Sequence, residues 1–219
     1  INEANYAYDN FEFYKVFHLI NNFCVVELSS LYLDISKDVL YANKENSKAR
    51  RAIQTTMYRA LDVMLKIFAP IMPFTTEEAY QSMQQKEKES IHLCAIPKPE
   101  NKETDNSLEE KWSRILSLRE EVSKVLEEAR RNKVIGHSLD ADIKLGLNEE
   151  MYKIFSSSDI EPESIFIVSN VYLEKSEKQN IEVNKSTFNK CARCWQYKKE
   201  VGKIKNYEEI CERCKKEIS

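Results

Sequence analysis

Four cysteines near the end of the chain have the spacing of metal ligands. Cys191 and Cys194 form one Cys-x-x-Cys pair. After sixteen intervening residues, Cys211 and Cys214 form a second pair. Such a turn can direct two thiolates at one point, and two turns complete a tetrahedral shell around Zn²⁺. Because all four ligands would be protein sulfur, no position remains for water or substrate, so the pattern predicts one structural zinc ion whose binding is coupled to local folding.

The alternative interpretation of the cysteine pairs is two redox-active dithiols. The paired spacing and the flanking basic residues make this alternative the weaker one, and nothing in the sequence points to secretion. We therefore expect a reduced chain in the cytoplasm. Cys24 and Cys94 lie in apolar stretches and are expected to be buried packing residues.

Basic residues surround the cysteine pairs. Residues 185–219 contain ten Lys/Arg and five Asp/Glu, whereas the rest of the chain contains 23 and 31. A basic end on an acidic body suits contact with a polyanion, although solubility alone would also account for it. Trp195 is either a platform for a nucleic-acid base or the largest core residue of a small metal domain. The candidate RNA contacts are Arg193, Trp195, Lys198, Lys203 and Arg213, together with Arg50 and Arg51 near a predicted helix start.

The first part of the chain is predicted to be helical. The whole chain has only three glycines and five prolines, and 32% of its residues are charged. Apolar residues recur at steps of three and four over residues 17–39 and again over 53–68, which predicts two amphipathic helices. The Pro70-Ile-Met-Pro73 segment ends the second helix. Thr75 and Glu78 predict the capping box of a third.

A change of composition over residues 84–106 predicts a linker. Ser107 and Glu110 predict another capping box, for a helix that ends before Gly136. The apolar period then changes from 3.6 to 2, so residues 143–147, 164–173 and 181–183 are predicted to be strands.

These elements predict a mainly α chain: an antiparallel helical bundle, a small α/β module and a C-terminal zinc-binding domain with four cysteine ligands. The predicted boundaries are 1–95 for the bundle, 96–185 for the linker with the α/β module, and 186–219 for the zinc-binding domain.

No apolar run approaches the roughly 20 residues that span a bilayer, and we expect no membrane association. The sequence also contains no Gly-rich phosphate loop, no convincing nucleophile–base set and no open metal site. We therefore expect the chain to catalyse nothing alone. It begins without Met, inside what is predicted to be a structured region, which suggests the end of a longer protein.

Several stretches together resemble class I aminoacyl-tRNA synthetases. Residues 22–41 resemble the first long helix of the anticodon-binding bundle of isoleucyl-tRNA synthetases, and residues 126–136 their connecting helix. Residues 65–78 resemble the Pro-interrupted junction that the isoleucine, valine and leucine enzymes share. Cys191-Ala-Arg-Cys-Trp-Gln, Val201-Gly-Lys and Ile210-Cys-Glu-Arg-Cys214 resemble the zinc-binding C-terminal extension of the bacterial-type isoleucine enzyme.

The resemblance implies the C-terminal part of an enzyme that joins isoleucine to its tRNA using ATP. Residues 1–95 would then be the anticodon-binding bundle, and the catalytic and editing domains of a monomeric parent would lie upstream. The four cysteines would be the metal ligands, and the partner would be the anticodon stem-loop. RNA contacts around the zinc domain of the family point to Arg193 and Trp195.

Three rival interpretations remain open. The first is the same region of a valyl or leucyl enzyme, which the paired-cysteine tail and Ser29-Ser-Leu-Tyr-Leu-Asp34 argue against. The second is a zinc-stabilised protein-interaction module that never touches RNA, and the acidic first part of the chain favours it slightly. A DNA-repair zinc finger is more distant, because it leaves the helical bundle unexplained.

Overall fold

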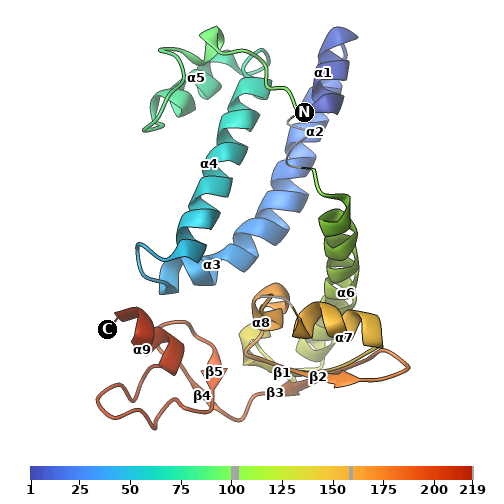
Figure 1. Cartoon of the computed structure of the whole chain (residues 1–219), viewed down its shortest axis with the longest axis vertical. Helices are drawn as coiled ribbons and strands as arrows, with labels where there is room; N and C mark the ends of the chain where they lie inside the picture. The colour runs from blue at the N-terminus through green and yellow to red at the C-terminus, as the bar shows by residue number, and fades with distance from the viewer. Residues whose placement is uncertain (100–103, 158–159, 219) are drawn as a thin grey trace. The chain divides into compact units, whose positions relative to one another are not determined.

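The computed structural model describes residues 1–99, 104–157 and 160–218, and it divides into two compact units. The helical unit comprises Ile1–Ser36 and Glu45–Thr104. The sheet unit comprises Lys37–Lys44 and Asp105–Ser219. Helices predominate in both units, which confirms the mainly α prediction (Figure 1). The predicted three-part division of the chain stays a prediction.

The helical unit is built from short and long helices in sequence. These are α1 (Asn2–Asp9), α2 (Phe13–Asn22), η1 (Phe23–Tyr32), the start of α3 (Leu33–Ala42), α4 (Lys48–Phe68), α5 (Pro73–Gln81) and the 3₁₀ turn η2 (Ile91–Leu93). The Ser47 hydroxyl accepts from the Arg50 amide and caps α4. Helix α4 packs against α2, α5 and η2.

Among its described residues, the helical unit is held together by two small apolar cores. One contains Leu65 and Ala69 from the end of α4 with Tyr80 of α5. The other contains Val16 of α2 with Ile67 of α4. The buried residues of α4 thus lie in its last turns. Elsewhere along the predicted stripe over residues 53–68, the apolar side chains are half-buried or, at Leu61, exposed.

The longest continuous helical stretch is Phe13–Ala42, which joins α2, η1 and α3. Its middle ten residues, Phe23–Tyr32, form a π-helix. Because a π-helix has a wider turn than an α-helix, the predicted 3.6-residue stripe does not stay on one face there. The π segment leaves all its residues at least partly exposed.

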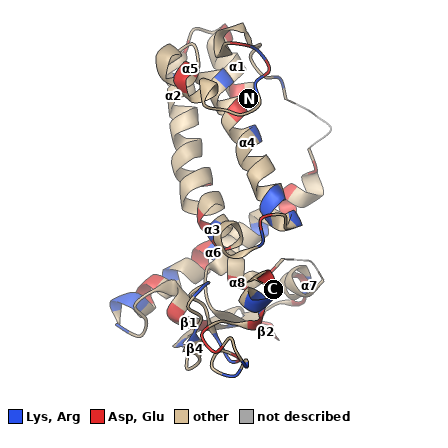
Figure 2. Cartoon of the chain, turned by 90° about the vertical axis from the view of Figure 1, so that its left-hand side faces the viewer, with Lys and Arg blue, Asp and Glu red and all other residues tan. Residues whose placement is uncertain are grey.

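This stretch is also unusually apolar. Between Lys15 and Lys37 the only charged residues are Glu27 and Asp34, and Figure 2 shows little charge along α2. Although no unbroken apolar run is present, an 18-residue window within Phe13–Ala42 has a mean hydropathy of 1.3, so this stretch could cross a membrane by length and composition. Helices that pack within globular proteins pass the same test, so this feature alone is weak evidence for a membrane.

Two predicted helix starts are wrong. Helix α5 begins at Pro73 rather than Thr75, and no side chain caps it. Proline favours the first helical position because it lacks an amide hydrogen and has a suitable φ. Helix α6 (Asn106–Arg131) is capped by Asp105, whose carboxylate accepts from the Leu108 amide at 3.0 Å, so Ser107 lies inside the helix.

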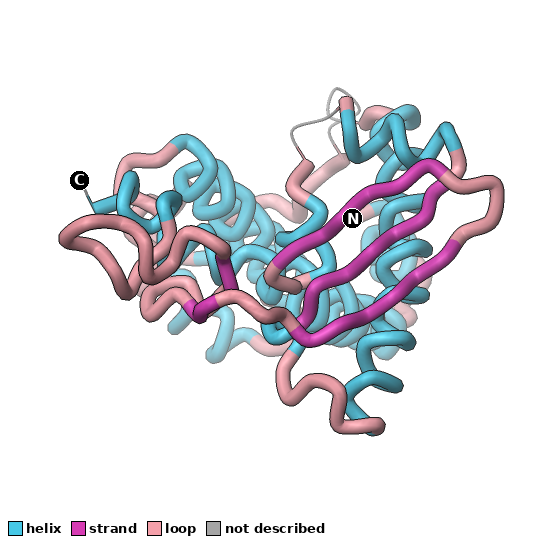
Figure 3. Tube along the Cα trace, turned by 90° about the horizontal axis from the view of Figure 1, so that it is seen from below, coloured by secondary structure: helices cyan, strands magenta, loops and turns pink. Residues whose placement is uncertain are grey.

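The sheet unit combines one long helix with a three-stranded sheet. After α6 come η4 (Ser138–Asp140), β1 (Ala141–Leu147), α7 (Glu149–Ser156), α8 (Pro162–Phe166), β2 (Asn170–Lys175), β3 (Asn180–Lys185), β4 (Asn189–Lys190), β5 (Tyr197–Lys198) and α9 (Glu212–Ile218). The strand order is β2-β1-β3, with β1 parallel to β2 and antiparallel to β3 (Figure 3). Ile143 of the central strand faces Val171 and Val183 in the register.

The predicted first and third strands are confirmed, whereas the second is partly wrong. Residues 164–173 begin as α8, which starts at Pro162 and ends where Ile167 adopts a left-handed φ of 56°. Strand β2 starts only at Asn170. The preceding long helix ends at Arg131, before Gly136 as predicted, and the residue with a left-handed φ that follows it is Lys133 (φ 60°) rather than Gly136.

Candidate metal centre

Short elements near the C-terminus bring the cysteine pairs together. We call residues 186–218 the cysteine module. Its strands β4 and β5 pair in antiparallel register, and the loop between them carries Cys191 and Cys194. The Cys191 amide donates to the Gln196 carbonyl at 2.9 Å and closes this loop. Cys211 immediately precedes α9, and Cys214 lies in its first turn.

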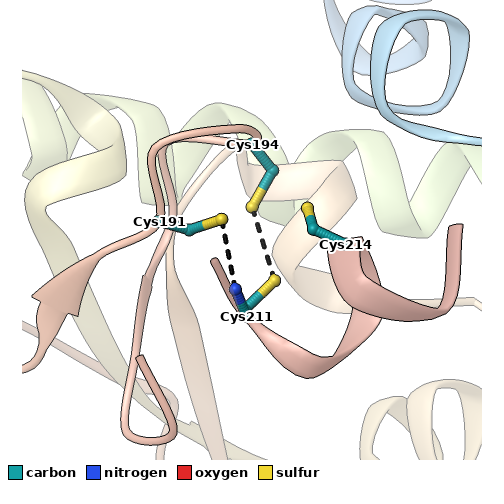
Figure 4. Close-up of side chains that lie close together, drawn as sticks. All are labelled: Cys191, Cys194, Cys211 and Cys214. Atoms are coloured by element: carbon teal, nitrogen blue, oxygen red, sulfur yellow. Dashed lines mark hydrogen bonds between the residues drawn. The ribbon is translucent and has the colours of Figure 1, made fainter. Parts of the chain in front are cut away.

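The four sulfur atoms converge on one point (Figure 4). All of them lie within 4.8 Å of one another, and Cys194 Sγ is 3.8 Å from Cys211 Sγ. A tetrahedral zinc site with Zn–S distances of about 2.3 Å has S–S edges of about 3.8 Å, whereas a disulfide needs about 2.05 Å. The Cys211 amide also donates to Cys191 Sγ at 3.3 Å, which suits a thiolate acceptor. The arrangement therefore fits a zinc site.

The cluster is mostly buried in a very small apolar shell. Cys191, Cys211 and Cys214 are buried, and Val201 is the only other buried apolar residue packed with them among the residues that the structure describes. Hydrogen bonding by the neighbouring thiols, with the largest contribution from Cys194, lowers the pKa of Cys211 to about 3. Hydrogen bonding to the same neighbours, again mainly to Cys194, raises the pKa of Cys214. Four thiolates this close need a bound cation to balance their charge.

Trp195 is exposed and conformationally strained. Its side chain has 62% relative exposure, and its backbone has a φ of +65°. A non-glycine residue in this region costs roughly 1–2 kcal/mol, and such strain often occurs at functional positions. The Trp195 amide donates to the Cys191 carbonyl at 2.9 Å, so the loop holds the ring outward. The exposure excludes the interpretation that Trp195 is a core residue of the module.

Lys190 lies beside this ring and was not among the predicted contacts. Its Nζ is 5.7 Å from the centroid of Trp195 and 6.0 Å from that of Tyr197. The sequence feature that could have identified Lys190 as a candidate contact is its position directly before Cys191, among the basic residues that flank the cysteine pairs. Lys203, which was predicted, is exposed.

Three of the other predicted contacts bond within the sheet unit. Lys198 Nζ donates to the Ser169 carbonyl at 2.6 Å. Arg193 Nη2 donates to the Ala42 carbonyl at 3.0 Å. Arg213 forms a bidentate ion pair with Asp38. These basic side chains therefore already have partners in the chain.

Arg50 and Arg51 belong to the helical unit. The Arg50 amide takes part in the Ser47 cap. Arg51 is exposed and donates to the side chains of Gln54 and Asn46 at 3.3 and 3.4 Å. Both lie in the first turn of α4, where the helix dipole does not favour a cation.

Comparison with known proteins gives matches along almost the whole chain. Residues 1–145 match the family described as the anticodon-binding domain of tRNA ligase. Residues 188–216 match the zinc finger found in FPG and IleRS.

The curated relatives are isoleucine–tRNA ligases. The chain is 42% identical to that of Natranaerobius thermophilus over 98% of the chain and 25% of the relative. It is 44% identical to that of Carboxydothermus hydrogenoformans (95% and 24%) and 39% identical to that of Staphylococcus carnosus (94% and 23%). The chain thus spans about a quarter of the length of these relatives.

Proposed function

Because the chain belongs to the family of anticodon-binding domains of tRNA ligases, we propose that it recognises the anticodon arm of a tRNA that accepts isoleucine. The match over residues 1–145 carries this proposal. The isoleucine specificity is supported by relatives that align with nearly all of the chain, the cysteine module included. We propose further that the parent is a monomeric cytoplasmic enzyme that joins isoleucine to tRNA using ATP, with its catalytic and editing domains upstream.

The second part of the proposal is that Cys191, Cys194, Cys211 and Cys214 hold one structural zinc ion. The sulfur spacing, the amide donor to Cys191 and the zinc-finger match support it. When bound, the ion would supply only rigidity, because four protein ligands leave no open position. The module has too small an apolar core to fold on hydrophobic burial alone.

The third part concerns RNA contact by this module. Trp195 offers an exposed ring on which an unstacked anticodon-loop base can stack. Lys190 and Lys203 are exposed cations that can contact phosphates, which fix the register of the RNA without reading its sequence. We assign no direct RNA contact to Arg193, Lys198 and Arg213, because each bonds to another part of the chain. Arg50 and Arg51 stay candidate contacts of the helical unit.

Filter binding with radiolabelled tRNA tests the proposal and separates it from its rivals. We expect binding of an isoleucine tRNA to weaken by about 10-fold or more between 50 and 200 mM KCl, because each phosphate contact releases counterions. Equal affinity for valine or leucine tRNA would favour the same region of those enzymes. An absence of tRNA binding at low salt would favour the protein-interaction module.

A further inference from the structure

Two adjacent residues at the start of β2 bind the backbone of Tyr197, the first residue of β5. Ser169 directly precedes β2, and Asn170 is its first residue. The Tyr197 amide donates to Ser169 Oγ at 2.6 Å, and Asn170 Nδ2 donates to the Tyr197 carbonyl at 3.0 Å. Lys198 adds a further bond, from its Nζ to the Ser169 carbonyl at 2.6 Å. The cysteine module is thus attached to the central sheet on both sides of one residue.

Ser169 and Asn170 are themselves fixed by the sheet. Ser169 is fully buried, and its hydroxyl donates to the Leu139 carbonyl. Asn170 pairs with Asp142 in the parallel register of β2 and the central strand β1, and its Nδ2 also donates to Asp142 Oδ1 at 2.6 Å. A side-chain amide has two N–H donors, so Asn170 can serve Asp142 and Tyr197 together.

Tyr197 in turn lies beside the proposed RNA contacts of the cysteine module. It pairs with Lys190 in the register of β4 and β5, and Lys190 Nζ is 6.0 Å from the centroid of its ring. The same Nζ is 5.7 Å from the centroid of Trp195, which precedes Tyr197 by two residues. Fixing the Tyr197 backbone therefore fixes the position of Lys190 and the end of the loop from which the Trp195 ring projects.

We propose that Ser169 and Asn170 are positioning residues for RNA binding. They orient the loop of the cysteine module so that Trp195 and Lys190 present one fixed surface. A surface that adopts its bound orientation only part of the time binds with an affinity reduced by that fraction. This inference rests on the RNA-contact part of the proposed function and not on zinc.

The variant that tests the positioning is Asn170→Ala, and the probe is a fluorescently labelled anticodon stem-loop of an isoleucine tRNA. We expect the affinity, measured by anisotropy, to fall by about 2- to 12-fold, the range that the net contribution of one hydrogen bond gives. The zinc content should stay unchanged, because Asn170 acts on the Tyr197 backbone and not on a metal ligand.

Asn180→Ala is the matched control. Asn180 lies on β3 of the same sheet, and its amide donates to Glu182 of its own strand at 3.1 Å. We expect this variant to bind the stem-loop as tightly as the unmodified chain. Equal affinities for Asn170→Ala and Asn180→Ala would overturn the proposal.

A double-mutant cycle with Trp195→Gly, which removes the ring, separates positioning from general stability. If Asn170 acts through the ring, Asn170→Ala should cost much less affinity in the Trp195→Gly chain than in the unmodified chain. Equal losses in the two backgrounds, or a loss of zinc from Asn170→Ala, would contradict the positioning role.

A fluorine spectrum observes the ring without RNA. The chain has two tryptophans, Trp112 in α6 and Trp195, so incorporation of 5-fluorotryptophan gives two ¹⁹F signals. Asn170→Ala should shift or narrow the Trp195 signal and leave the Trp112 signal unchanged, and an unchanged Trp195 signal would count against the proposal. If Trp195→Gly kept full affinity for the stem-loop, the proposed RNA contact would fail and the positioning with it. This outcome is distinguishable from a loss in Trp195→Gly without one in Asn170→Ala, which overturns the positioning alone.

Discussion

Replacing Cys214 with serine is expected to abolish tight zinc binding and to unfold residues 186–218. Cys214 is fully buried, and a hydroxyl is a poor substitute for a thiolate ligand. Zinc-finger peptides gain about 10–16 kcal/mol from the metal, which far exceeds what the burial of Val201 supplies. Amide hydrogen exchange is the measurement: protection should disappear in the cysteine module while β1 of the central sheet keeps it.

Cys24→Ser is the control for this prediction. Cys24 is half-buried in the helical unit, where its Sγ lies 3.7 Å from the Met64 sulfur. The variant should keep both the zinc and the protection of residues 186–218. A Cys214→Ser chain with unchanged protection would show that the module folds without the metal.

Replacing Trp195 with glycine is expected to weaken tRNA binding by roughly 5- to 150-fold. This range corresponds to the roughly 1–3 kcal/mol that stacking of one base on an aromatic side chain contributes. Glycine removes the ring but adopts the observed φ of +65° without strain, so the loop and the zinc site should be preserved. Fluorescence anisotropy with a labelled anticodon stem-loop measures the affinity, and metal analysis checks the zinc.

Trp195→Phe provides the comparison, because it keeps an aromatic face in the same backbone. We expect its affinity to lie much closer to that of the unmodified chain. If Trp195→Gly binds as tightly as Trp195→Phe while both retain zinc, the ring does not contact RNA.

The meeting point of the four sulfurs was predictable because it depends on local sequence. Each Cys-x-x-Cys pair lies in one turn, and only the closure of a sixteen-residue segment brings Cys194 near Cys211. The roles of the basic residues were not predictable in this way. Arg193 and Arg213 bond to residues 151 and 175 positions away in the sequence, and a charge pattern cannot distinguish an internal carboxylate from a phosphate.

The secondary structure was likewise predicted correctly where the sequence pattern was strong and wrongly where it was ambiguous. Apolar residues alternate clearly with other residues over residues 143–147, and the strand predicted there is confirmed as part of β1. The predicted helix starts were wrong where two start signals lie close together: the cap Asp105 precedes Ser107, and Pro73, which favours the first helical position, precedes Thr75. The π-helix over Phe23–Tyr32 has an apolar composition that fits an α-helix equally well. The spacing of its apolar residues therefore gave no indication of the wider turn.

Zinc bound by four cysteine sulfurs is the basis of the proposed function of the cysteine module, and X-ray absorption at the zinc edge tests it directly. The reduced chain should contain one zinc per molecule, with four sulfur neighbours at about 2.3 Å and no nitrogen or oxygen ligand. A chain purified under reducing conditions that contains no zinc, or a spectrum that requires nitrogen or oxygen in the first coordination sphere, would contradict it.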